Sequence, residues 1–208
     1  MRRSLADVAR ANSLFGGTRA VLAELRPVIA ACGDRTLTLL DVGTGAGDIA
    51  LAARSRAAAR GVGIVTIGAD TSIALAASAA DRLDLSVAAN ALALPFADRS
   101  VDVVVCSQLL HHFAEREIAT VLRELHRVAR VRVIISDLRR SWVAAAGIWL
   151  ASFPLHFHPI SRHDGVLSVL RGFTAAELSA HIVRATGATP SVTRRLGWRV
   201  TASWTPIA

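Results

Sequence analysis

Residues 39–48, with the sequence LLDVGTGAGD, constrain the fold of this chain more than any other stretch. Their apolar start is typical of a buried strand, and the strand stops in a glycine-rich turn that leads into a predicted helix over residues 49–60. Glycines reach positive φ angles and let a ligand lie against bare backbone. In open α/β sheets, nucleotide-like ligands bind at such strand ends. The alternative is an ordinary strand-to-helix turn without a ligand.

The spacing of the glycines excludes several nucleotide-binding turns. A dinucleotide-binding turn that begins at Gly43 needs a glycine at position 48, where this chain has Asp48. The chain also contains no lysine and no tyrosine. It therefore lacks the lysine of a P-loop, the Tyr/Lys pair of short-chain dehydrogenases and the lysine of Schiff-base enzymes.

Strand and helix patterns alternate along the chain, which predicts a mostly parallel sheet with helices on both faces. Apolar runs predict strands over residues 36–42, 62–69, 85–89, 100–107 and 131–137. Helices are expected over residues 4–31, with a break near Gly16 and Gly17, and over 49–60, 73–80 and 115–130. Residues 191–205 predict a terminal antiparallel hairpin. We expect one domain over residues 1–208, with a helical cap over 1–34 and a helical insertion, a substrate lid, over 138–187.

All basic residues are arginines, and the net charge is +8. Basic surfaces favour binding to nucleic acid. These arginines, however, are scattered along the sequence and do not alternate with aromatic residues, so nucleic acid is not the favoured partner. An anionic substrate or compositional bias explains the charge equally well. Cys32 and Cys106 lack metal-ligand spacing, and Cys106 lies in an apolar run that predicts burial. No secretory signal is visible, which predicts a cytoplasmic location.

Two further segments complete the pattern of an adenosyl-binding site. Asp70 ends the second predicted strand, about 20 residues beyond the glycine turn, where an acidic residue commonly binds ribose hydroxyls. The alternative role for Asp70 is to cap the next helix. Residues 89–105 (ANALALPFADRSVDVVV) then lead through Ser107 to the pair His111 and His112.

Residues 39–48 resemble motif I of the class I S-adenosyl-L-methionine (SAM)-dependent methyltransferases, a hydrophobic strand followed by Asp/Glu-x-Gly-x-Gly-x-Gly. Residues 89–105 resemble the Asp-Ala-x-x-Leu-Pro-Phe-x-Asp-x-Ser-Phe-Asp-x-Val segment of the small-molecule methyltransferases related to those of ubiquinone and menaquinone biosynthesis. His111 and His112 match the Leu-His-His element of that family. The resemblance covers about residues 10–137. It implies a Rossmann-like α/β fold with a mostly parallel seven-stranded sheet, an antiparallel C-terminal strand, and SAM as the cofactor.

The resemblance also implies which residues hold the cofactor. The turn after the first strand forms the cradle for its amino-acid part, and Asp70 with Thr71 binds the ribose. Asn90 replaces the family's acidic residue at the adenine amino group, with the backbone of Ala91 beside the ring. Arg19 is the candidate partner of the cofactor's carboxylate, and Ser107 lies beside the methyl group. The expected cofactor-binding residues are Arg19, Asp41, Gly43, Thr44, Gly45, Asp70, Thr71, Asn90, Ala91 and Ser107.

The candidate catalytic residues are His111, His112 and His163, because a histidine can act as a general base near neutral pH. The alternative is that His111 and His112 only shape the pocket. Residues 155–165 are rich in histidine and aromatic residues and predict an acceptor pocket. A metal site from His156, His158, His163 and Asp164 is conceivable but not favoured, since no cysteine joins the cluster.

We expect methyl transfer to a small, mainly apolar acceptor, with O-methylation of a phenolic or polyketide-type hydroxyl preferred. The alternatives are C-methylation of a quinone-type ring, RNA methylation, or a non-catalytic SAM-binding partner subunit. The apolar segment 141–153 is too short to span a membrane. It predicts a core or lid helix, with weak contact to a membrane surface as the alternative. The chain is expected to be a monomer or a homodimer.

Overall fold

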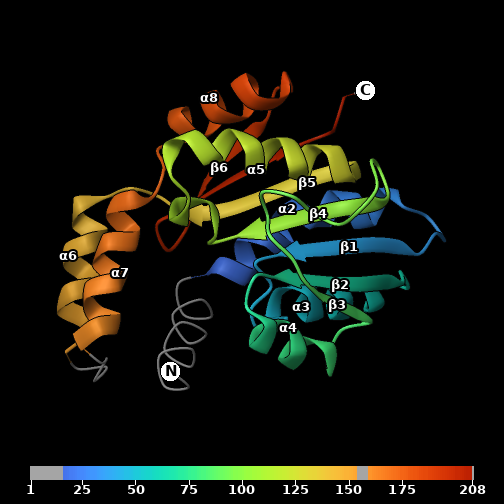
Figure 1. Ribbon diagram of the computed structural model, residues 1–208, viewed down its shortest axis with the longest axis horizontal. Coiled ribbons are helices and arrows are strands. Elements are labelled where there is room, and N and C mark those ends of the chain that lie inside the picture. Colours follow the sequence, from blue (N-terminus) through green and yellow to red (C-terminus); the bar gives the residue numbers. More distant parts are fainter. Residues whose placement is uncertain (1–15, 154–158, 208) are drawn as a thin grey trace.

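The computed structural model describes residues 16–153 and 159–207, and its centre is a seven-stranded sheet with helices on both faces (Figure 1). The strand order is β3-β2-β1-β4-β5-β7-β6. The strands are β1 (Leu37–Val42), β2 (Ile64–Asp70), β3 (Leu85–Ala88), β4 (Val101–Ser107), β5 (Ala129–Leu138), β6 (Ser191–Arg195) and β7 (Arg199–Trp204).

Strand β7 pairs antiparallel with both β5 and β6, whereas β1 to β5 pair in parallel. This arrangement confirms the predicted fold class. From β1 the chain proceeds outward to β2 and β3, and it then crosses back to β4 on the other side of β1. The strand order thus reverses between β1 and β4, which is the place where ligands bind in open α/β sheets.

The helices divide into two layers and a separate pair. The helices are α2 (Gly17–Ala31), α3 (Asp48–Ala58), α4 (Ile73–Ala80), the 3₁₀ helix η1 (Leu110–His112), α5 (Glu115–Val128), α6 (Trp142–Ala151), α7 (Pro159–Arg171) and α8 (Ala175–Thr186). Buried residues of α2, α3 and α4 pack on one face of the sheet, and those of α5 and α8 pack on the other. Figure 1 shows α6 and α7 standing beside the sheet, apart from both layers.

Alternate residues of the central strands enter the two cores. Leu37 and Leu39 of β1 pack with α2 and α3, whereas Leu40 and Val42 pack on the side of α5. Side chains of a strand point alternately to opposite faces, so a strand covered on both faces must be apolar throughout. This explains the unbroken apolar runs that predicted the strands.

Most predicted elements match the structure closely at their ends. The helix over 73–80 has the predicted bounds, and Ser72 caps it by accepting a hydrogen bond from the Leu75 backbone N–H at 3.4 Å. Helix α7 lies in the region 138–187 that was predicted as a helical insertion, and it overlaps residues 155–165, for which the sequence predicted an acceptor pocket without specifying a helix. Residues 4–15 of the predicted N-terminal helix, and also His156 and His158, lie outside the described residues.

One buried carboxylate joins helix α2 to the antiparallel end of the sheet. Glu24 accepts hydrogen bonds from Arg195 Nη2 and Thr201 Oγ1, both at 2.6 Å, and from Ser203 Oγ at 3.0 Å. Burial raises the pKa of Glu24, but the hydrogen bonds and the charge of Arg195 outweigh burial, so the pKa lies below its usual value of 4.5. The carboxylate is therefore charged at neutral pH and fastens α2 to β6 and β7.

We expect Glu24→Ala to lower the free energy of unfolding by about 3 kcal/mol at neutral pH, because three donors lose their acceptor. Since the pKa is lower in the folded state, this stabilisation is present above about pH 4.5 and is lost as the pH falls below it. Urea unfolding at pH 7 and at acidic pH measures both effects, with the exposed Asp34→Ala as the control. An equal loss of stability for the two variants would contradict the prediction.

Candidate cofactor and acceptor site

The carboxyl ends of four parallel strands bring the predicted site residues to one edge of the sheet. Asp41 of β1 pairs in register with Gly68 of β2, two residues before Asp70. Ser107 of β4 pairs with Ser136 of β5. The glycine turn, the end of β2 and the segment after β4 are therefore neighbours.

The glycine turn has the backbone form that its sequence predicts. Gly43, Gly45 and Gly47 all have positive φ angles, of 75°, 55° and 80°. The Gly45 backbone N–H donates to Asp70 Oδ2 at 3.0 Å, which joins the turn to the end of β2. A Cβ atom on Gly43 would meet Leu109 at 3.0 Å, whereas one on Gly45 would have open space around it. The turn therefore presents bare backbone at Gly45, as a cradle for a ligand requires.

Asp41 lies beneath the turn and is almost completely buried. Its Oδ2 accepts a hydrogen bond from Thr44 Oγ1 at 3.0 Å. Burial raises the pKa of Asp41 to about 7; the Thr44 hydrogen bond opposes this rise, while the charges of Asp70 and Asp48 add to it. Asp48 itself is paired with Arg82 at 2.9 Å, so its charge is balanced within the protein.

Asp70 organises the turn and retains capacity to bind a ligand. Its Oδ1 accepts from the Ser72 backbone N–H at 2.9 Å, in addition to the Gly45 bond on Oδ2. Each carboxylate oxygen can accept a second hydrogen bond, so ribose hydroxyls can still bind there. Asp70 is half-buried, and Thr71 is exposed beside it.

The other expected cofactor residues differ in their exposure and in their hydrogen bonds. Asn90 is exposed, and its side-chain oxygen accepts from the Leu92 backbone N–H at 3.0 Å, while Ala91 is buried. Ser107 Oγ is buried without a hydrogen-bond partner among the described residues, and such an orphaned hydroxyl suits a polar ligand atom. Arg19 lies exposed in the first turn of α2. Together with the open backbone of Gly45, these groups fit SAM.

His111 forms a buried pair with an aspartate that the sequence analysis did not select. Its Nδ1 lies 2.6 Å from Asp137 Oδ1, and its backbone N–H donates to Asp137 Oδ2 at 3.2 Å. The Leu138 backbone N–H also donates to Oδ1, at 2.7 Å. Arg199, almost fully buried, lies on the neighbouring strand; burial lowers its pKa to about 10 and Asp137 opposes this change, so the guanidinium is charged at neutral pH.

His112 stacks beside His111 but has a different environment. The two ring centroids are 4.1 Å apart. Burial lowers the pKa of His112, and the positive charges of His111, when protonated, and Arg171 lower it further, while Asp137 opposes them. His112 is therefore neutral at neutral pH.

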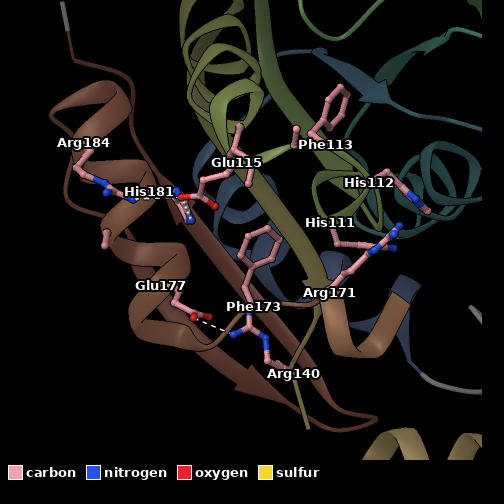
Figure 2. Close-up of a pocket in the computed structure, with 13 residues that line it drawn as sticks. His111, His112, Phe113, Glu115, Arg140, Arg171, Phe173, Glu177, His181 and Arg184 are labelled. Atoms are coloured by element: carbon pink, nitrogen blue, oxygen red, sulfur yellow. Dashed lines mark hydrogen bonds and ion pairs between the residues drawn. The ribbon is translucent and has the colours of Figure 1, made fainter. Parts of the chain in front are cut away.

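Both histidines line a pocket of about 700 Å³ between η1, the start of α5, the end of α7 and helix α8 (Figure 2). Two aromatic side chains, Phe113 and Phe173, belong to its wall. The rest of the lining is more charged than the mainly apolar cleft that the sequence predicted. The charged and titratable lining residues are His111, His112, Glu115, Arg140, Arg171, Glu177, His181 and Arg184.

Several of these charges are paired across the pocket (Figure 2). Arg140 donates to Glu177 at 3.0 Å, and Glu115 lies 3.6 Å from His181 and 3.9 Å from Arg184. The Glu177 carboxylate also completes the capping box of α8 with Thr174, as its sequence spacing indicates. The pairs fasten α8 to α5 and to the chain after β5.

His163, the third predicted catalytic residue, is exposed on α7 and does not line this pocket. Within the described part of the chain, no group of three His, Cys, Asp or Glu side chains is placed to hold a metal ion. The residues missed by the sequence analysis are Asp137, Arg140 and Arg171. Asp137 carries a usable signal, because it stands near the carboxyl end of a predicted strand, as Asp70 does.

Comparisons with known proteins agree with this site. A profile of the methyltransferase domain matches residues 40–135, which hold the glycine turn, Asp70 and the two histidines. That segment is a little less than half of the chain. This match supports a methyltransferase domain that uses SAM as its cofactor. A search of curated proteins found no match.

Solved methyltransferase structures share the fold of this chain at low sequence identity. A SAM-dependent methyltransferase from Aquifex aeolicus is 18% identical, with 96% of this chain and 98% of that chain covered and a TM-score of 0.64. The magnesium protoporphyrin IX methyltransferase of Synechocystis PCC 6803, with bound SAM, is 14% identical, with coverages of 92% and 80% and a TM-score of 0.61. The CMeT domain of the citrinin polyketide synthase is 14% identical, with coverages of 91% and 52% and a TM-score of 0.68.

We expect Asp70→Ala to weaken SAM binding at least tenfold, because the variant loses a charged acceptor and the bond that positions Gly45. Isothermal titration calorimetry with SAM measures the change. The exposed Asp81→Ala serves as the control and should bind as the wild type does. Unchanged affinity in Asp70→Ala would contradict the placement of the cofactor.

Asp41 makes the stability of the ligand-free protein depend on pH in a defined direction. The folded protein keeps the Asp41 proton up to about pH 7, whereas the unfolded chain loses it near pH 4. Between these values the folded state binds more protons, so this group lowers stability as the pH rises, by up to about 1.4 kcal/mol per pH unit. Thermal unfolding from pH 4 to 7 should show a smaller loss of stability in Asp41→Asn. Parallel curves for the two proteins would refute the assignment.

Proposed function

We propose that this chain is a SAM-dependent methyltransferase and that it transfers a methyl group to a hydroxyl of a small aromatic acceptor, of phenolic or polyketide type. The observation that carries the proposal is the buried His111–Asp137 pair at the wall of the 700 Å³ pocket. A hydroxyl must lose its proton as it is methylated, so a positioned base is useful for O-methylation. The volume lies in the range of sites that hold small molecules.

Asp137 positions His111 for this role. A carboxylate accepts hydrogen bonds, so the short contact to Nδ1 favours the tautomer with the proton on Nδ1. The other ring nitrogen, Nε2, then has a free lone pair. The backbone N–H groups of His111 and Leu138 hold the carboxylate in place. The pair thus has the base-and-orienting-group arrangement of general-base catalysis.

When bound, SAM supplies an electrophilic methyl group on a sulfonium. The residues of the chain then have three tasks, which are to hold the acceptor in line, to keep water out and to take up the hydroxyl proton. Phe113 and Phe173 offer apolar ring surface to an aromatic acceptor. Alignment contributes most of the rate in such a reaction, and His111 Nε2 receives the proton.

The charged lining refines the expected acceptor. Arg171 belongs to the pocket wall, together with the ion pairs Arg140–Glu177 and Arg184–Glu115. An acceptor with polar or acidic groups on an aromatic ring therefore fits this wall better than a wholly apolar molecule. This refinement keeps the aromatic acceptor that the sequence predicts and changes only the groups that the ring carries.

The alternatives are C-methylation of a quinone-type ring, methylation of RNA, and a non-catalytic SAM-binding subunit. The resemblance of residues 89–113 to the ubiquinone and menaquinone enzymes supports the first, and the net charge of +8 supports the second. A cytoplasmic location and a monomeric or homodimeric state also stay proposals. Incubation with labelled SAM and a panel of phenols, quinols and short RNAs separates these alternatives, because each names a different methylated product.

We expect His111→Ala to lower kcat for the best acceptor of that panel by about a hundredfold or more, with SAM affinity unchanged. Asp137→Asn should also lower kcat, since an amide does not orient the same tautomer reliably. Radiometric turnover and calorimetric SAM binding give the two readouts. A His111→Ala enzyme with full kcat would refute the role of the base, while failure of every acceptor despite tight SAM binding would favour the non-catalytic subunit.

A further inference from the structure

Helices α6 and α7 form a pair that stands beside the carboxyl edge of the sheet, away from the two layers that cover it (Figure 1). A small core of their own holds the pair together, with Ala144 and Ala145 of α6 packed near Val169 of α7. None of the described helices has the length and hydropathy that a membrane crossing requires.

The outer side of α6 is apolar and exposed. The exposed fractions are 77% for Trp142, 72% for Val143, 49% for Trp149, 62% for Leu150 and 47% for Phe153. With 3.6 residues per turn these positions fall on one side of the helix, opposite the buried alanines. Residues 141–153 contain no charged residue. Contiguous exposed apolar side chains of this size mark an interaction surface.

Arginine side chains border this apolar face. At its far end, the Arg162 guanidinium lies 3.8 Å from the centre of the Phe153 ring, and the Phe153 and Trp149 rings meet edge to face at 4.9 Å. At its near end, Arg139 precedes α6, whereas the next residue, Arg140, is paired with Glu177 in the pocket wall. Residues 139–171 hold four arginines against a single acidic residue, Asp164. The face is therefore apolar in its middle and cationic at its borders.

We propose that the outer face of α6 docks on the surface of an anionic lipid bilayer, with its aromatic side chains in the interfacial layer and the bordering arginines at the lipid phosphates. Tryptophan prefers the interface between hydrocarbon and water, and arginine is attracted to anionic headgroups. The ten residues of α6 are about 15 Å long, so the helix lies along the surface and does not cross it. The net charge of +8 favours the same partner at longer range.

Membrane docking places the acceptor pocket close to the bilayer. Helix α7 packs on α6 and ends at Arg171, which lines the pocket beside His112 (Figure 2). The docking surface and the pocket wall thus belong to one continuous pair of helices. The proposal needs no particular acceptor, and its test does not use turnover.

The test is flotation of the full-length protein with vesicles of equal parts phosphatidylglycerol and phosphatidylcholine, and with vesicles of phosphatidylcholine alone. We expect binding to the anionic vesicles that decreases as salt rises to about 0.5 M. Leu150→Glu should reduce this binding about tenfold, because it places a carboxylate in the apolar face. Ile207→Glu is the matched control, since Ile207 is 54% exposed and its backbone carbonyl lies 3.2 Å from His126 Nε2 of α5.

Calorimetric SAM binding by both variants shows that they are folded. Three outcomes would overturn the proposal: no binding to anionic vesicles, equal binding to neutral vesicles, or wild-type binding by Leu150→Glu. Self-association that Leu150→Glu abolishes, without vesicle binding, would also overturn it and would assign the face to a second copy of the chain. None of these results depends on whether an acceptor is methylated.

Discussion

The parallel pairing of β1 with β4 is the constraint on which the site depends. Val42 pairs with Cys106, so the turn after β1 and the segment after β4 begin at the same level of the sheet. They also touch, because the Leu109 side chain lies 3.0 Å from the position that a Cβ atom on Gly43 would take. A glycine is therefore needed at position 43 both for its φ of 75° and for this close approach. The same pairing makes the glycine turn a neighbour of the segment that leads to His111 and His112.

The cofactor side could be predicted from sequence because its requirements are local. A buried strand that ends in alternate glycines fixes the turn at Gly43 and Gly45, and an acid at the next strand end fixes Asp70. The acceptor side could not be predicted in this way. Asp137 meets His111 only because β4 and β5 pair in register, and Arg171 reaches the pocket only because helix α7, whose bounds were not predicted, ends there. Such contacts join residues that are distant in sequence and leave no spacing to recognise.

Two buried aspartates at this edge illustrate how surroundings assign different roles to the same side chain. Asp41 receives one side-chain hydrogen bond, from Thr44, and burial therefore dominates its pKa. Asp137 receives two backbone N–H groups and the His111 ring, and the charged Arg199 lies near it. Hydrogen bonds and a nearby cation compensate a carboxylate for the loss of water. Asp137 is thus equipped to orient an imidazole, whereas Asp41 supports the turn above it.

The cofactor can be identified and the acceptor cannot, because the cofactor cradle is made largely of backbone whereas the pocket proposed for the acceptor is made of side chains. SAM fits a cradle made largely of backbone, whose form depends on glycines and on the ends of β1 and β2. The pocket proposed for the acceptor is made of side chains from η1, α5, α7 and α8, and ion pairs join α8 to α5 and to the chain after β5. Those side chains can change without disturbing the cradle. Since α7 packs on α6 and ends at the pocket, the pocket wall and the exposed apolar face share one pair of helices.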